Sequence, residues 1–390
     1  MNIGVVKESV GESRVAMTPD VTKKLSAYSL LVETQAGCAA GYPDGVFEPV
    51  AEVVTKRQSL VERAHILVAI NLPDDDTIRC MKPGTILIGQ LSPSKNIESI
   101  KLLARMGVSA FSLDLLPRTT QAQSMDILSS QSNLAGYQAV ICAASMLGRA
   151  FPMMTTAAGN VPPVRVLVIG AGVAGLQAIA TAKRLGCVVS AFDVRSATRE
   201  QVESLGATFI SVASHESGEG GGGYAKEMSD AYKANQEARL MEVMPRQDVV
   251  ITTAQIPNKP APKIITKEMV ASMRSGGLVV DLAGASGGNC ELAVPGECVQ
   301  CGEQRVWAPL NIINGVANTA SFLFASNVAA FVRTLIRSDG TAAAAAAAGV
   351  GTGAAAAGAG TAAGAPLFDV GDELVRRTLV AHDGAVCPLL

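Results

Sequence analysis

No charge of either sign is in surplus in this sequence of 390 residues. Lys and Arg total 32 against 34 Asp and Glu, which gives a formal net charge of −2, and no basic stripe or arm stands out. A protein that grips nucleic acid through its phosphates needs such a stripe on one face. We therefore expect no nucleic-acid partner.

Long runs of strongly hydrophobic residues are missing as well. Hydrophobic residues make up 48% of the chain, but no stretch of about 20 Leu, Ile or Phe residues is present to cross a bilayer. The one long uncharged run, residues 341–365, consists mainly of Ala and Gly. Ala and Gly carry little transfer energy and Gly disfavours a helix, so this run predicts a flexible low-complexity linker. We expect no membrane span in this chain.

A secretory leader and a metal-ligand pattern are also absent. The first residues, MNIGVVKESV, alternate like a strand, so the eight cysteines are expected to be reduced thiols in a cytosol-like compartment. Cys298 and Cys301 have the spacing of half a zinc or redox site, but no second pair exists and the three histidines lie far away in sequence. We predict no metal site, and a role for this pair stays open.

What the sequence does contain is a regular alternation of short β-branched strands and helical stretches. The segments NIGVVKE, SLLVETQ, HILVAIN and GTILIGQL predict a mainly parallel, doubly wound α/β sheet. Long apolar helices are expected over residues 132–150 and 318–337 as connections between domains. We predict an N-terminal α/β domain over residues 1–135, completed by about 320–390, and a Rossmann-like domain over 136–317. The cofactor site is expected in the cleft between these two doubly wound domains.

The most specific motif is VRVLVIGAGVAGLQAIATAKRLGCVVSAFDVR, residues 164–195. A buried strand, three spaced glycines, a helix, a second strand and a terminal acid follow in the order of a dinucleotide-binding unit. The first glycine permits a tight turn, the second lets the backbone approach a pyrophosphate, and the third lets helix and strand pack closely. The predicted phosphate-binding residues are Gly170, Gly172, Val173, Ala174 and Gly175.

Asp193, at the end of the second strand, is predicted to select the nucleotide. A carboxylate there pairs with both ribose hydroxyls and repels a 2′-phosphate, so NAD(H) is favoured over NADP(H). Arg195 leaves the alternative open, because a guanidinium can accept that phosphate. Further cofactor contacts are expected beside this acid, at a later strand exit and on a glycine-rich flap over residues 214–233, which is otherwise a surface loop without a role. These residues are Val194, Arg195, Thr253, Ala254, Gln255, Tyr224 and Met228.

Together these pieces resemble the family shared by alanine dehydrogenase and the NAD(H)-binding component of proton-translocating nicotinamide nucleotide transhydrogenase. The resemblance begins with KESVGESRVAMTP (residues 7–19), passes through the glycine motif and DLAGASGGNCE (281–291), and ends in GDELVRRTLVAHDG (371–384). It covers essentially the whole chain. Only the segment APLNIING, residues 308–315, departs from the Gly-Tyr-Thr-Asp-x-Pro-x-Arg-like pattern of transhydrogenases.

The two branches of this family differ in chemistry. The alanine dehydrogenase pattern carries a Lys before Glu-Pro, a downstream His, and an Asp before Gln-Gly-Gly. The matching positions here are Asn71, Ser92 and Ala285, and of that substrate-binding set only Arg14 remains. The resemblance therefore favours the transhydrogenase branch. An alanine dehydrogenase-like amino-acid dehydrogenase and a non-catalytic NAD(H)-binding regulatory module are the alternatives.

The stretch RTTQAQSMDILSS, residues 118–130, contains no His, Cys or Lys that could move a proton. Its resemblance to the transhydrogenase branch implies a loop beside the nicotinamide, in which Asp126 and Ser129 orient the carboxamide. By the same resemblance Arg118 organises the loop and Gln123 reaches towards NADP(H) on a partner. Hydride transfer between two nicotinamide rings moves no proton at the reacting carbons, so no general acid–base is required. The alternative is a solvated polar loop.

The resemblance also implies partners and a location. It predicts a homodimer that works with an NADP(H)-binding component and a membrane-spanning proton-channel component. This chain, which ends at Leu390 before any membrane segment, is then expected as a separate subunit or module at the matrix or cytoplasmic face of a mitochondrial inner or bacterial plasma membrane.

Overall fold

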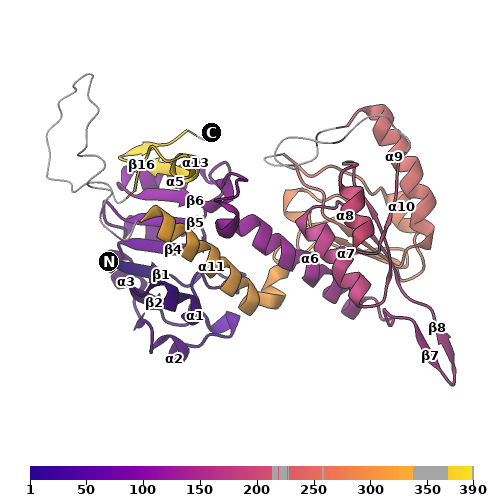
Figure 1. Cartoon of the computed structure of the whole chain (residues 1–390), viewed down its shortest axis with the longest axis horizontal. Coiled ribbons are helices and arrows are strands. Elements are labelled where there is room, and N and C mark those ends of the chain that lie inside the picture. The colour runs from indigo at the N-terminus through magenta and orange to yellow at the C-terminus, as the bar shows by residue number, and fades with distance from the viewer. Residues whose placement is uncertain (213–217, 219–225, 227, 257–258, 337–367, 389–390) are drawn as a thin grey trace. The chain divides into compact units, whose positions relative to one another are not determined.

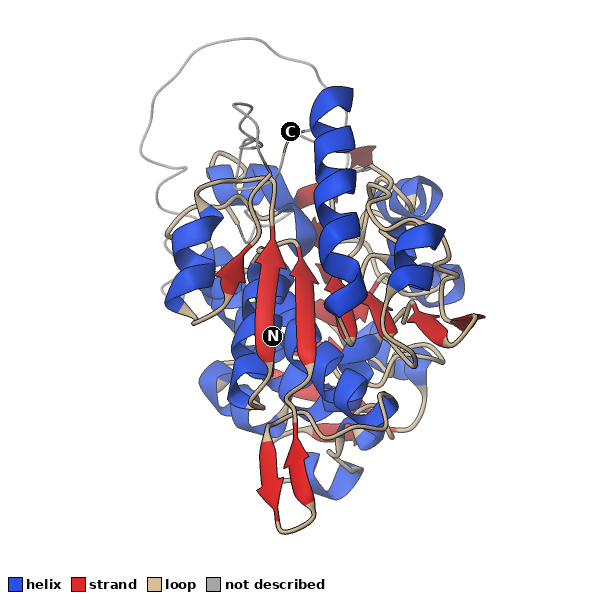
Figure 2. Ribbon diagram, turned by 90° about the vertical axis from the view of Figure 1, so that its right-hand side faces the viewer, coloured by secondary structure: helices blue, strands red, loops and turns tan. Residues whose placement is uncertain are grey.

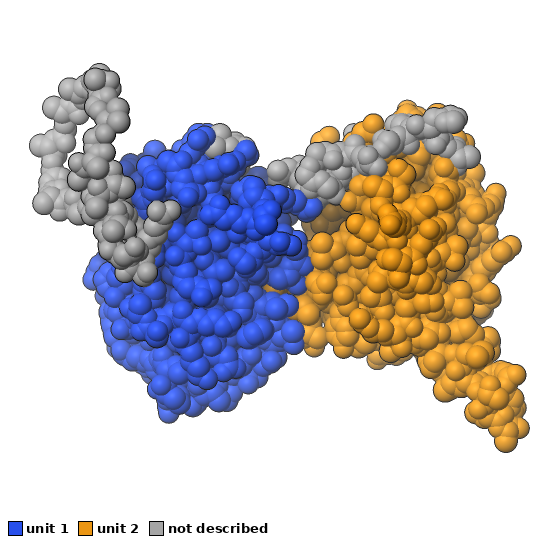
Figure 3. All heavy atoms as spheres, viewed as in Figure 1, with its two compact units in different colours: residues 1–130, 317–390 blue, residues 131–316 orange. Residues whose placement is uncertain are grey.

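The computed structural model describes residues 1–212, 218, 226, 228–256, 259–336 and 368–388 (Figure 1). Contacts divide the chain into two compact units (Figure 3). Unit 1 contains Met1–Ser130 and Ala317–Leu390, and unit 2 contains Gln131–Val316. Tyr224 and the predicted linker over 341–365 lie outside the described residues.

Unit 1 is built on an eight-stranded sheet in the order β17-β16-β6-β5-β4-β1-β2-β3. The strands are β1 Asn2–Val5, β2 Ser29–Glu33, β3 Glu52–Val54, β4 Ile66–Asn71, β5 Ile86–Gln90, β6 Ser109–Ser112, β16 Leu379–His382 and β17 Ala385–Val386. Strands β1 to β6 run parallel, and β16 and β17 add an antiparallel edge. The centre of the sheet is apolar on both faces, as in sheets covered by helices on both sides.

The helices of unit 1 cover this sheet. They are α1 Pro19–Thr22, α2 Asp44–Phe47, α3 Arg57–Arg63, α4 Asp75–Arg79, α5 Ile97–Arg105, α11 Ala317–Leu335 and α13 Glu373–Thr378. Helix α11 runs along the sheet (Figure 1), and Phe324, Val328 and Phe331 lie in the same core as the strand residues Ile3 and Ile66. Among the described residues one helix, Ile312–Leu335, is long and apolar enough to cross a membrane. Its apolar face belongs to the core of unit 1.

Unit 2 contains a seven-stranded sheet in the order β11-β10-β9-β12-β13-β15-β14. Its strands are β9 Arg165–Ile169, β10 Val188–Phe192, β11 Thr208–Phe209, β12 Val249–Thr252, β13 Leu278–Asp281, β14 Cys298–Cys301 and β15 Gln304–Trp307, and only β14 is antiparallel to its neighbour. The helices are α6 Ile127–Met146, which begins in unit 1, α7 Val173–Arg184, α8 Thr198–Ser204, α9 Asp230–Val243 and α10 Lys267–Ser272. Strands β7 Met154–Thr156 and β8 Gly159–Val161 form a hairpin that extends away from the rest of unit 2 (Figures 1 and 2).

The prediction of two Rossmann-like α/β domains is confirmed by these sheets. The expected helix over 132–150 is instead α6, which begins at Ile127 and ends at Met146. The helix starts earlier because Asp126, directly before it, accepts the backbone N–H of Ser129 and so caps its first turn. The predicted cleft between the domains stays a prediction.

Both sheets contain the same topological switch point. The parallel strands follow the order 3-2-1-4-5-6, and the chain reverses direction between β1 and β4 in unit 1 and between β9 and β12 in unit 2. In open α/β sheets, ligands bind beyond the carboxyl ends of the two strands at this point. The fold therefore offers two places in which to look for a site.

Candidate functional site

At the switch point of unit 2 the glycine motif meets the exit of β12. Gly170 follows β9 with a φ of 93°, in the left-handed region that favours glycine. Thr253 follows β12; its N–H donates to the Ile169 carbonyl (2.8 Å) and its hydroxyl to the Gly170 carbonyl (3.0 Å). A Cβ on Gly170 would lie 2.6 Å from that hydroxyl oxygen. The two strand exits are thus tied together, and the predicted contact Thr253 lies beside the motif.

The other two glycines of the motif have opposite surroundings. A Cβ on Gly175 would lie 1.8 Å from the Gly170 carbonyl oxygen, so only glycine lets α7 pack this closely on the turn. A Cβ on Gly172 would meet no atom within 4 Å, although Gly172 directly precedes the first residue of α7. The space in front of the helix amino terminus is therefore open. An open helix amino terminus, with unsatisfied N–H groups, fits the phosphates of a dinucleotide.

Gly136, on helix α6, supports the motif from another side and was not predicted. A Cβ on Gly136 would lie 2.0 Å from the carbonyl oxygen of Ala174, in the first turn of α7. Helix α6 therefore packs backbone against backbone on the phosphate-binding turn. The sequence signal was a glycine inside a predicted helix, which often marks such a close approach.

Asp193, directly after β10, is buried and makes contacts on both carboxylate oxygens. Oδ2 accepts the Ala171 N–H at 2.6 Å, which holds the glycine turn. The guanidinium of Arg195 donates to Oδ1 and Oδ2 at 2.8 and 2.7 Å, and the Arg195 N–H donates to Oδ1 at 2.8 Å. This pairing raises the pKa of Arg195 further above its ordinary value. Ribose hydroxyls would have to share this carboxylate with Arg195, whose charge is directed at Asp193.

Two buried side chains that were not predicted fix the strand exits. The Asn289 amide accepts the Ala254 N–H (3.0 Å) and donates to the carbonyls of Ala254 (2.8 Å) and Pro262 (2.9 Å). Asp281, at the end of β13, accepts the N–H groups of Ala283 and Cys290. The predicted contact Ala254 is therefore held on both its polar backbone groups.

The remaining predicted cofactor contacts of unit 2 differ in exposure. Gln255 is exposed, Val194 is half-buried and Met228 is buried, each following or preceding an element of the Rossmann-like sheet. In the described regions of the chain, no three His, Cys, Asp or Glu side chains gather as metal ligands.

The polar loop of residues 118–130 lies in unit 1, after β6. The Asp126 carboxylate accepts the N–H of Ser129 at 2.9 Å and its hydroxyl at 2.5 Å, so these two predicted residues form one hydrogen-bonded pair. Arg118 and Gln123 are exposed on the same loop. Three apolar side chains between them anchor the loop in the core of unit 1: Ala122, Met125 and Ile127.

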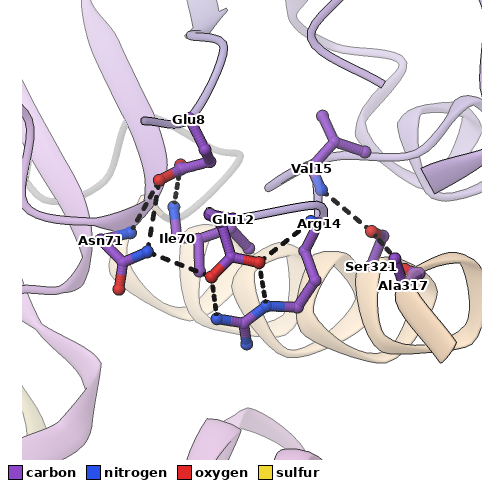
Figure 4. Close-up of polar contacts among 8 residues, drawn as sticks. All are labelled: Glu8, Glu12, Arg14, Val15, Ile70, Asn71, Ala317 and Ser321. Carbon is purple, nitrogen blue, oxygen red and sulfur yellow. Dashed lines mark hydrogen bonds and ion pairs between the residues drawn. The ribbon is translucent and has the colours of Figure 1, made fainter. Parts of the chain in front are cut away.

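Charged side chains fill the switch point of unit 1 (Figure 4). The Glu8 carboxylate accepts the N–H groups of Ile70 (2.6 Å) and Asn71 (3.3 Å) at the end of β4. Glu12 and Arg14 form a buried ion pair with N–O distances of 2.6 and 2.8 Å, and the Asn71 amide donates to both carboxylates. Desolvation by burial raises the pKa of Glu8 to about 7.

Comparison with known proteins gives consistent matches for both units. The family models "Alanine dehydrogenase/PNT, N-terminal domain" and "Alanine dehydrogenase/PNT, C-terminal domain" match residues 4–135 and 139–364. The first of the polypeptides that make up the NAD(P) transhydrogenase subunit alpha of Rhodospirillum rubrum is 44% identical over 350 residues, which cover 87% of this chain and 91% of the relative. The corresponding polypeptide from Rickettsia prowazekii is 40% identical, with 99% and 96% covered.

Solved structures agree with these matches. The transhydrogenase from Sinorhizobium meliloti superposes with a TM-score of 0.85 at 40% identity and covers 99% of this chain and 100% of its own. An L-alanine dehydrogenase superposes with a TM-score of 0.76 at 21% identity over 99% and 96% of the two chains, which shows a shared fold.

Proposed function

The chain belongs to the alanine dehydrogenase/PNT family, among the NAD(P) transhydrogenase alpha subunits, and from this premise we propose that it binds NAD(H) and exchanges hydride with NADP(H) held by a partner component. The observation that carries the proposal is the open switch point of unit 2. There the glycine turn, the amino terminus of α7 and Asp193 come together at the carboxyl edge of the sheet.

The residues of unit 2 hold the cofactor in this proposal. The turn at Gly172 and the first N–H groups of α7 bind the phosphates, and Asp193 with Arg195 contacts the adenosine ribose. Thr253, Ala254 and Gln255, at the exit of β12, bind nearer the nicotinamide, and Tyr224 and Met228 close over it. When bound, NADH supplies the hydride.

The loop of unit 1 supplies positioning in this proposal. Asp126 and Ser129 orient the nicotinamide carboxamide, Arg118 organises the approach, and the exposed Gln123 reaches the partner. Two rings that exchange hydride must be held in contact with water excluded, and a general acid–base is not required. The absence of His, Cys and Lys between residues 118 and 130 supports this chemistry.

An amino-acid dehydrogenase has less support from the switch point of unit 1. Such an enzyme needs a cation for the substrate carboxylate and a group that titrates. Arg14 is already paired with the Glu12 carboxylate, and Asn71 presents an amide that does not titrate. Glu8 is held by two backbone N–H groups. These side chains occupy the position at which a small substrate would bind.

The wider assembly belongs to the proposal as well. Relatives described as subunit alpha imply further subunits, and we propose that these bind NADP(H) and translocate protons across a membrane. This chain would then act as a homodimer at the matrix or cytoplasmic face of that membrane.

A hydride-transfer assay tests the proposal. One cuvette contains the purified chain, NADH, the acetylpyridine analogue of NAD⁺, and an NADP(H)-loaded partner component from a transhydrogenase; omission of the partner is the control. A second cuvette contains the chain with NADH, pyruvate and ammonium. Reduction of the analogue only with the partner is the expected result. NADH consumption with pyruvate would establish an amino-acid dehydrogenase instead, and NADH binding without either reaction would indicate a regulatory module.

A further inference from the structure

Asn327, on helix α11, contacts the polar loop on both sides of Asp126. Its Nδ2 donates to the carbonyl of Ser124 at 2.8 Å, and its Oδ1 accepts the hydroxyl of Ser130 at 2.7 Å. A carbonyl can only accept, so Nδ2 must face Ser124, and Oδ1 is left for the hydroxyl. Both polar ends of one buried side chain are therefore used on a single turn of the loop.

These two bonds enclose the predicted nicotinamide-binding pair. Ser124 belongs to the short 3₁₀ turn η4, Gln123–Met125, and Ser130 lies in the first turns of α6. Asp126 and Ser129 lie between the two bonded positions and are bonded to each other. A displacement of η4 relative to α6 would break one of the Asn327 bonds, so Asn327 fixes the geometry of the turn that carries the pair.

The helix that carries Asn327 is itself firmly held. Its neighbours Phe324, Val328 and Phe331 are fully buried in the core of unit 1. Nearer its start, the Ser321 hydroxyl accepts the N–H of Val15 and donates to the Ala317 carbonyl. Asn327 thus links an otherwise polar loop to the well-packed core of the unit.

We propose that Asn327 is a positioning residue for hydride transfer. The inference rests on the proposed function and adds a residue that the loop sequence does not contain. Asn327 acts through the Asp126–Ser129 pair and does not grip the cofactor, which the glycine turn of unit 2 holds. Loss of its two bonds lowers the fraction of bound NADH that is correctly oriented. A misplacement of about 1 Å can cost roughly 100-fold in rate.

The test compares Asn327→Ala with a matched loss elsewhere on the same helix. Asn318 also donates its amide to a backbone carbonyl, that of Ala40 at 2.9 Å, far from the loop. We expect Asn327→Ala to lower kcat in the partner-dependent assay roughly 10- to 100-fold while the Kd for NADH changes less than about twofold. Asn318→Ala should leave both constants unchanged. Equal kcat for Asn327→Ala and the unaltered chain overturns the inference.

Further variants separate positioning from folding. Ser130→Ala removes one of the two bonds and should lower kcat less, and its effect should vanish in the Asn327→Ala background because the partner is already gone. Asn327→Asp keeps the acceptor for Ser130 but places an oxygen against the Ser124 carbonyl, so it should not restore the rate. An additive double variant, or full activity of Asn327→Asp, contradicts the inference.

Amide hydrogen exchange judges the positioning without the partner. Residues 124–130 should exchange faster in Asn327→Ala than in Asn318→Ala, and equal exchange overturns the inference. If the unaltered chain shows no partner-dependent transfer, the proposed function fails first, and the exchange result still decides whether Asn327 holds the loop.

Discussion

The two units share one strand order around their switch points and use the crevice in opposite ways. In unit 2 the crevice is kept open, since a side chain at Gly172 would meet no atom within 4 Å. In unit 1 the same place is filled by Glu8, Glu12, Arg14 and Asn71, which bond to one another and to the end of β4. The strand order supplies a crevice twice, and the side chains decide whether a ligand can enter it.

The two arrangements also depend on different kinds of interaction. The open crevice depends on backbone packed directly on backbone, which only glycine permits. The filled crevice depends on carboxylates kept out of water, which raises the pKa of Glu8. Steric variants should therefore damage unit 2, and changes of pH or charge should act on unit 1.

The largest effect is expected from Gly175→Ala. The new methyl group would lie 1.8 Å from the Gly170 carbonyl oxygen, and neither backbone segment can move without opening the glycine turn. We expect the free energy of unfolding to fall by about 3 kcal/mol or more, as in severe overpacking, and NADH binding to be lost. Urea unfolding and a fluorescence titration with NADH measure the two effects.

Gly172→Ala is the matched control for that variant. Gly172 has a φ of −80°, which any residue adopts, and its added methyl group meets no neighbour. Its free energy of unfolding should change by less than about 1 kcal/mol, while NADH affinity falls because the methyl group enters the space for the phosphates. Unchanged NADH affinity in Gly172→Ala would mean that the open crevice is not the cofactor site.

The next effect concerns Glu8 and pH. Its pKa is about 7 in the folded chain against an ordinary value of 4.5, so the folded state binds the proton more tightly. Stability should therefore fall as pH rises from 4.5 to 7, by about 3 kcal/mol in total, and stay level above. Glu8→Gln should remove this slope when urea unfolding is measured across the range.

Exposed Glu52 provides the control for Glu8. Its pKa is lowered by the hydrogen bond from Arg63, so Glu52→Gln should change the pH dependence only slightly and in the opposite sense. A Glu8→Gln variant with the same pH slope as the unaltered chain would contradict the assignment of the raised pKa to this carboxyl.

A smaller effect should follow from Asp193, because both crevices contain an acid paired with the arginine two residues later. Asp193→Asn removes the charge that repels a 2′-phosphate and releases Arg195 from its partner. The ratio of NADPH to NADH affinity should rise about tenfold, which corresponds to about 1.4 kcal/mol. The double variant Asp193→Asn with Arg195→Gln should lose that gain, and an unchanged ratio in the single variant would exclude Asp193 from the ribose site.

The sequence predicts the open crevice better than the details around it, for a physical reason. The glycine motif and Asp193 are readable because the turn, the helix amino terminus and the second strand constrain one another within 32 residues, from 164 to 195. Asn289 holds Ala254 across 35 residues, and Asn327 holds Ser124 across 203. An isolated asparagine carries no local pattern, so these contacts become visible only in the folded chain.

The polar loop shows a different reason for an incomplete prediction. Its residues predict chemistry by resemblance, yet Asp126 followed three positions later by Ser129 is also the pattern of a helix start. The structure uses it as one, and α6 consequently begins within the loop. One acid thus has a structural contact that must be separated from any role in hydride transfer.

The smallest expected stability effect separates those two roles and adds a third region to the comparison. Asp126→Ala removes the cap of α6 and should lower the free energy of unfolding by about 1 kcal/mol, whereas Asp126→Asn keeps an acceptor and should cost less. Asp372 caps α13 in the same way, through the Leu374 and Val375 N–H groups, so its Ala and Asn variants should repeat these stability changes without affecting transfer. Both Asp126 variants should slow partner-dependent hydride transfer. If Asp126→Asn transfers hydride as fast as the unaltered chain, the carboxylate serves only as a cap, and the loop, like the filled crevice of unit 1, has a structural role alone.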